Sequence, residues 1–132
     1  MRHLFPRILA AAAVTVMALG MSVQPAHAAV SWSYTRASGQ WIQSAGTAKY
    51  DNVLDRFYLY DNRADGAGVY AEVTLNRQGS QTNYFYWGGG GGTSSSWAAN
   101  YPSGFSIEYR VCLQDNGQVQ AGTCSFLTRF NT

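Results

Sequence analysis

Histidine is absent from most of this 132-residue chain, because both copies, His3 and His27, lie within the first 28 residues. Without histidine, residues 29–132 cannot build a Ser-His-Asp or Cys-His catalytic arrangement or a histidine-ligated zinc site. Lysine is scarce as well, since Lys49 is the only one, and a lone lysine reads as a solvated charge. We therefore expect no catalytic residues, no metal and no cofactor.

An excess of charge of either sign is also missing from the larger part of the chain. Residues 29–132 carry seven Lys or Arg, because two of the nine basic residues precede them, against seven Asp or Glu. Charges of both signs are interleaved, so no basic run is present that could bind nucleic acid or an anionic membrane. We expect a near-neutral domain that has neither nucleic acid nor a membrane as a partner.

The one long apolar run lies at the N-terminus. Arg2 and Arg7 form a basic start, residues 8–23 are apolar, and a small-residue cleavage site ends at Ala28. These are the three parts of a secretory signal peptide, which we place over residues 1–28. No later run is long enough for a membrane span, so we expect the rest of the chain to be a single secreted, extracellular domain.

Cysteine occurs only twice, as Cys112 and Cys124. The first lies near the end of the clearest strand pattern of the chain, residues 105–113 (FSIEYRVCL), in which apolar and polar side chains alternate. An Asp-Asn-Gly turn then leads toward the second cysteine, and a last strand covers about residues 124–130. Because an exported domain is oxidised, we expect one disulfide, with two free thiols as the alternative.

Further strand patterns fill the middle of the chain. Residues 53–60 and 69–76 flank a turn rich in Asp and Gly, which predicts a hairpin. We place Val53 on the inner face of the first strand, although Asp55 breaks the alternation and indicates that the strand begins after it. Short strands separated by turns, with no amphipathic helix, predict an all-β fold, a small antiparallel β-sandwich, with a small barrel as the alternative.

Two regions have a less regular pattern. Residues 29–39 read as a short strand or an extended N-terminal arm, and Trp41 with Ile42 could begin another strand. Residues 81–87 carry aromatic rings on both faces, and the glycines that follow predict a flexible loop that continues to Trp97.

Aromatic residues are the strongest positive signal, since the chain has nine Tyr, four Trp and six Phe. Part of them must fill the core, to which we assign Phe57, Phe85, Phe105, Tyr109 and Phe126. Others lie at outward positions or beside the glycines, where Tyr and Trp either cover a sheet or anchor a binding partner. The candidate partner-binding residues are Trp32, Tyr34, Tyr58, Tyr70, Tyr84, Tyr86, Trp87 and Trp97.

Acidic residues offer weaker candidates. A pair of carboxylates could hydrolyse a glycoside without histidine, but the acidic residues read as turn or surface positions, which are Asp55, Asp61, Asp65, Glu72, Glu108 and Asp115. The segment from Asp61 to Glu72 matches part of an EF-hand calcium loop. Arg63 stands where that loop needs an oxygen ligand, so we read a turn and leave a different calcium geometry open.

The Ala-rich leader, the short aromatic strands and the motifs DNRADGAGVYAEV (61–73) and YRVCLQDNG…AGTC (109–124) resemble small secreted β-sandwich proteins of filamentous actinobacteria. Within that group the layout is similar to the adaptor subunit of umbrella toxin particles. The resemblance implies a scaffold that joins toxin-bearing and lectin-bearing subunits in antagonism between bacteria, with residues 29–39 as a docking arm.

Three functions follow as expectations. The first is a secreted, non-enzymatic adaptor that binds other secreted proteins through the arm and the aromatic residues. The second is a carbohydrate-binding module, because Tyr and Trp rings stack on sugars. The third is an inhibitor that presents residues 88–97 to a hydrolase, although five glycines make such a loop costly to order.

Overall fold

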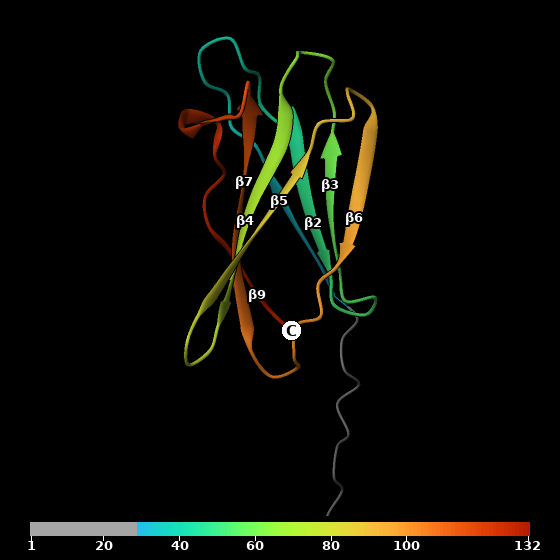
Figure 1. The fold of residues 1–132 in the computed structure, drawn as a ribbon, viewed down its shortest axis with the longest axis vertical. Coiled ribbons are helices and arrows are strands. Elements are labelled where there is room, and N and C mark those ends of the chain that lie inside the picture. The colour runs from blue at the N-terminus through green and yellow to red at the C-terminus, as the bar shows by residue number, and fades with distance from the viewer. Residues whose placement is uncertain (1–28) are drawn as a thin grey trace, which may run out of the picture.

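The computed structural model describes residues 29–132, and the predicted signal peptide lies outside the described residues. These residues form two antiparallel sheets packed face to face (Figure 1), which confirms the prediction of an all-β sandwich. The elements are β1 (Val30–Tyr34), β2 (Gly46–Asp51), β3 (Arg56–Asp61), β4 (Gly68–Asn76), β5 (Gln81–Trp87), β6 (Thr93–Ala98), β7 (Ser106–Asp115), β8 (Gln118–Gln120), the 3-10 turn η1 (Ala121–Thr123) and β9 (Thr128–Asn131). The first sheet has the order β1-β2-β3-β6. The second has the order β5-β4-β7, and both β8 and β9 pair with β7.

The core lies between the sheets and follows the alternation of the sequence. In β7 four inward side chains are at most 1% exposed, and they are Ile107, Tyr109, Val111 and Leu113. The Phe57 side chain of β3 contacts the opposite sheet. Its ring stacks on the ring of Phe85 with centroids 5.1 Å apart and meets the ring of Tyr109 edge-on at 5.3 Å. The predicted core positions Phe57 and Tyr109 are confirmed, and Phe85 packs against the core while partly exposed.

The predicted hairpin between residues 53–60 and 69–76 is wrong. The strand β3 pairs with β2 and β6, whereas β4 pairs with β5 and β7 in the other sheet. Residues 62–67 carry the chain over one end of the sandwich, from the first sheet to the second (Figure 1). Alternation predicts which face of a strand is buried, but a turn-rich connection fits both a hairpin and a crossing between sheets.

In the N-terminal segment residues 30–34 form a short strand, the first of the two alternatives expected for residues 29–39, and they do not form an extended arm. Along β1 the backbone pairs with β2 in register, and Ser31 and Ser33 point inward at 7% and 4% exposure. The Ser31 hydroxyl hydrogen-bonds the hydroxyl of Tyr109 at 2.7 Å, which anchors this edge strand to the core. Buried serines give no hydrophobic alternation, so the sequence could not distinguish a strand from an arm.

Two other placements near strand ends also differ from the predictions. Trp41 does not begin a strand with Ile42, because it exchanges two backbone hydrogen bonds with Ser38 inside a loop. Val53 is 64% exposed in the turn before β3, so its inward assignment is wrong. The strand starts at Arg56, directly after Asp55, as the broken alternation predicts.

The run Gly88–Gly92 is an ordered crossing, and the predicted loop up to Trp97 is wrong because residues 93–98 form β6. Gly90 and Gly92 have φ values of 93° and 82°, a conformation that favours glycine. The Gly92 amide donates to the carbonyl of Asp61 at 2.7 Å. At Gly91 the backbone of Ala64 leaves no room for a Cβ, so the glycine run packs tightly against the crossing of residues 62–67.

The C-terminal part contains the predicted disulfide between Cys112 and Cys124, which is confirmed. The last strand, predicted over about residues 124–130, is present but begins later, as β9, which pairs with the same edge of β7 as β8 does. Phe105 and Phe126 are not core residues, since they are 39% and 77% exposed. Phe105 precedes β7, and Phe126 lies in the irregular segment before β9, so neither follows the alternation of a strand.

Candidate binding surfaces

Four aromatic rings and one lysine share the outer face of the first sheet. These are Trp32 and Tyr34 of β1, Lys49 of β2, and Tyr58 and Tyr60 of β3, and we call these five residues the aromatic face. Their neighbours along each strand are buried, so the five side chains point away from the core. The strand register brings Trp32, Lys49 and Tyr58 into one cross-strand row. Such a row is the arrangement in which side chains on a sheet contact one another.

The contacts of Lys49 order the aromatic face. Its Nζ lies 4.1 Å from the ring centroid of Tyr58 and 5.5 Å from that of Trp32. Tyr60 completes the cluster, with ring centroids 5.8 Å from Trp32 and 6.3 Å from Tyr58. A cation held over exposed rings contributes about 0.5–1 kcal/mol. The lysine expected to be a solvated charge therefore fixes two rings, which lowers the entropy that a binding partner must remove.

A groove of 390 Å³ extends the aromatic face beyond β1. Trp32, Tyr34, Arg36 and Phe126 are among the residues that line it. The Arg36 guanidinium lies 4.6 Å from the ring centroid of Phe126, and that ring is one of the most exposed apolar groups in residues 29–132. Exposed apolar surface thus continues from the sheet face to the segment before β9.

The outer face of the second sheet carries a separate set, Tyr70 of β4 with Tyr84 and Tyr86 of β5, which we call the tyrosine face. Tyr84 and Tyr86 are 64% and 51% exposed. The rings of Tyr70 and Tyr84 stack at 6.1 Å, and the three tyrosines line a pocket of 390 Å³ with Gln114.

An ion pair lies beside the tyrosine face. Arg110 Nε donates to Glu72 Oε2 at 2.7 Å, and the hydroxyl of Tyr70 donates to Glu72 Oε1 at 3.4 Å. Burial, followed by the charge of Glu72, raises the pKa of Tyr70, so its hydroxyl remains a neutral donor at pH 7. This face combines stacked rings with hydrogen-bonding groups.

The two predicted tryptophans near the glycines belong to neither face. The Trp97 ring lies 5.3 Å from the ring of Phe85, and both pack against the core. Trp87 also packs against the core, and its Nε1 donates to the hydroxyl of Thr93 at 2.9 Å. The structure therefore divides the eight candidate residues into two opposite faces and a pair turned toward the interior.

Lys49 and Tyr60 are the residues of the aromatic face that the sequence-based list of candidates omits. Tyr60 had a signal, because it stands two positions after Tyr58 and so shares its face of the strand. No sequence signal identified Lys49, because its contacts depend on the position of β2 between β1 and β3 in the sheet.

A metal site finds no support in the part of the chain that the structure describes, where no three His, Cys, Asp or Glu side chains come together. Glu72, the last position of the calcium-loop match, pairs with Arg110 on the outer sheet face instead. Within the same residues there is also no helix of the length and apolarity needed to cross a membrane.

No protein-family model, curated protein or solved structure matches this chain. The resemblance to adaptor subunits of umbrella toxin particles therefore remains a prediction.

Proposed function

We propose that residues 29–132 form a secreted, non-enzymatic adaptor that binds another secreted protein through the aromatic face. The observation that carries this proposal is the surface formed by the exposed rings of Trp32 and Tyr34 with the half-buried rings of Tyr58 and Tyr60. Lys49 orders this surface, and the groove at Phe126 extends it. Exposed Trp and Tyr are the commonest anchors of protein interfaces, and rigid rings lose little entropy when they are covered.

Secretion is supported by two features. The signal-peptide pattern precedes the domain, and the disulfide is of the kind that persists in oxidising compartments. The finer proposal, a scaffold between toxin-bearing and lectin-bearing subunits, rests on the resemblance of the two motifs. Because β1 is bound within the sheet, docking by a free N-terminal arm is no longer part of the proposal.

The adaptor proposal predicts that a Trp32→Ala/Tyr58→Ala variant loses its partner. Tagged residues 29–132 are incubated with culture supernatant of the source organism, and proteins retained in fixed ratio are identified by mass spectrometry. We expect the dissociation constant for that partner to rise at least about tenfold in the variant, because anchor residues of an interface carry most of its affinity.

The matched control is Tyr84→Ala, which removes an exposed ring from the opposite face. It should bind the partner as well as the wild type does. Loss of binding in this control, with normal binding by the Trp32→Ala/Tyr58→Ala variant, would reverse the assignment of faces.

A carbohydrate-binding module is the second candidate, and the tyrosine face favours it. Stacked Tyr70 and Tyr84 offer flat rings to a sugar, while Gln114 and the Glu72–Arg110 pair offer hydrogen bonds. On this reading the domain is retained on an insoluble glycan such as cellulose or chitin, and Tyr84→Ala abolishes the retention. Passage of the wild type through a panel of such glycans would remove this candidate.

A further inference from the structure

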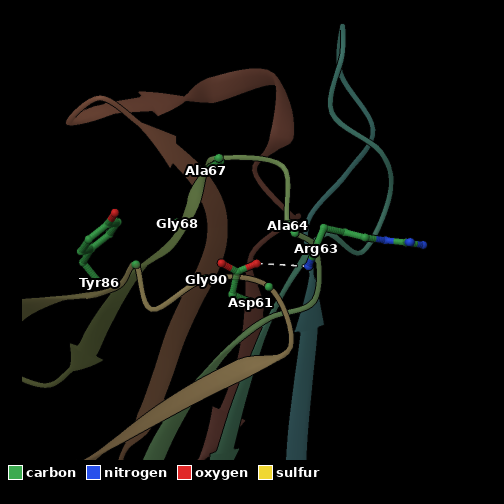
Figure 2. A pocket seen from close by; sticks show the side chains of 10 residues that line it. Asp61, Arg63, Ala64, Ala67, Gly68, Tyr86 and Gly90 are labelled. Carbon is green, nitrogen blue, oxygen red and sulfur yellow. Dashed lines mark hydrogen bonds between the residues drawn. The ribbon is translucent and has the colours of Figure 1, made fainter.

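Two of the three crossings between the sheets, residues 62–67 and the glycine run 88–92, lie at the same end of the sandwich (Figure 1). A pocket of 360 Å³ lies between them. Glycine and alanine make up most of its lining, and the larger side chains are Asp61, Arg63 and Tyr86 (Figure 2). The pocket is small and polar. It is separate from the aromatic face, and it shares only Tyr86 with the tyrosine face.

Asp61 is the unusual residue of this pocket, because it is a carboxylate at the end of β3 that is only 2% exposed. One oxygen, Oδ1, accepts the backbone N–H of Arg63 at 3.1 Å. The second oxygen points away from Arg63, toward the side of the pocket where Tyr86 lies (Figure 2). Among residues 29–132 the Arg63 N–H is the only hydrogen-bond donor to this carboxylate, so the second oxygen is left for a ligand.

The charge of Asp61 is uncompensated within the described chain. The ion pairs there are Arg110–Glu72 and Arg129–Glu108, and the side chain of Arg63 points out of the pocket (Figure 2). The other groups that titrate around it are Tyr86 and Asp65, while the glycine run adds none. Burial raises the pKa of Asp61, and the charge of Asp65 adds a smaller increase, although the hydrogen bond from the Arg63 N–H acts in the opposite direction.

The geometry points to a binding site for an organic cation: the guanidinium or ammonium group of a basic side chain that a protein partner inserts against the second oxygen of Asp61. A carboxylate at the floor of the specificity pocket is how trypsin selects basic side chains, and charge-assisted hydrogen bonds of this kind are the strong ones. Calcium fits less well, because it needs six to eight oxygen ligands and no group of three acidic side chains is present in residues 29–132.

The walls of the pocket suit a slender side chain. The hydroxyl end of Tyr86 lies against the backbone of Gly68 and Gly88, where any Cβ would collide with it. This contact keeps a ring at the border of the pocket, where a cation can also meet its face. The cation site stands on this geometry alone, and only the source of the cation, a protein partner, rests on the proposed function.

The test is a titration of ¹⁵N-labelled residues 29–132 with N-acetyl-L-arginine methylamide at pH 7, followed through the backbone amide signals of the glycines. We expect saturable shifts at Gly66, Gly88, Gly90 and Gly91, and none with the uncharged citrulline analogue. The Asp61→Asn variant keeps an oxygen for the Arg63 N–H and should bind the arginine probe at least about tenfold more weakly.

The matched control is Asp51→Asn. Asp51 Oδ1 also accepts backbone N–H groups in a turn, those of Val53 and Leu54, but at the opposite end of the β2–β3 pair. This variant should bind the arginine probe with wild-type affinity. The Trp32→Ala/Tyr58→Ala variant should also bind the arginine probe with wild-type affinity. A failure of the cation site and a failure of the adaptor proposal can therefore be told apart.

The folding of Asp61→Asn is checked by its melting temperature. Because the folded-state pKa of Asp61 is raised, its ionisation destabilises the fold as the pH rises above about 4, and the penalty is absent at about pH 3. The variant should therefore melt higher than the wild type at pH 7, and the two should differ less at pH 3. Equal shifts with the citrulline analogue, shifts with calcium chloride alone, or no shift with the arginine probe would each overturn the inference.

Discussion

Replacing Phe57 with alanine is expected to lower the free energy of unfolding by about 3–5 kcal/mol. The Phe57 ring is fully buried and lies between the sheets, where it contacts Phe85 and Tyr109. Its removal leaves a cavity that well-packed strands cannot close, and it breaks two aromatic contacts. Urea denaturation followed by circular dichroism measures the loss as a lower midpoint with an unchanged slope.

The matched control is Phe126→Ala, the same substitution at a ring that is 77% exposed. It removes one contact with the Arg36 guanidinium, so we expect the free energy of unfolding to fall by less than about 1 kcal/mol. The sequence pattern placed both phenylalanines in the core. Equal losses in the two variants would mean that Phe126 is buried and that the arrangement of the segment before β9 is wrong.

This contrast shows what alternation along a strand can predict. In β4 and β7 every second residue is apolar, so the buried face was evident from the sequence, and it is confirmed. Phe126 lies in an irregular segment, where no period links neighbouring side chains to a common face. β6 has one apolar ring, Trp97, in a run of Ser and Thr, and its strand character comes from pairing with β3.

The candidate surfaces were predictable to a similar degree. Outward positions on recognisable strands identified Tyr58, Tyr70, Tyr84 and Tyr86, and the structure leaves them at least partly exposed. The sequence could not show that Tyr58 faces the opposite side from the other three, because that depends on the sheet to which β3 belongs. Asp61 was likewise read as a turn residue, and its local bond to Arg63 is present. The burial of Asp61 depends on the glycine run 88–92, which is distant in sequence and packs against it.

Removal of the disulfide through Cys112→Ala/Cys124→Ala is expected to cost about 3 kcal/mol, the value for a closed loop of about 15 residues. The two cysteines are 12 positions apart and join β7 to the segment after η1. Cys112 is fully buried and Cys124 is 9% exposed, so their loss also removes packed sulfur atoms. Chemical denaturation should give a lowered midpoint for the variant, and a somewhat smaller decrease for the wild type with dithiothreitol present, which keeps its sulfur atoms.

The same segment is held by hydrogen bonds that the variant retains. The Thr123 hydroxyl accepts the N–H of Leu113 at 2.9 Å, and the Thr123 carbonyl accepts the N–H of Arg36 at 2.8 Å. We therefore expect the fold to survive, with hydrogen exchange faster at Arg36, Leu113 and Ser125 than in the core of β4. Because Arg36 borders the groove of the aromatic face, local opening here should also weaken partner binding. Uniformly faster exchange would instead mean that the disulfide stabilises the whole sandwich and not this corner.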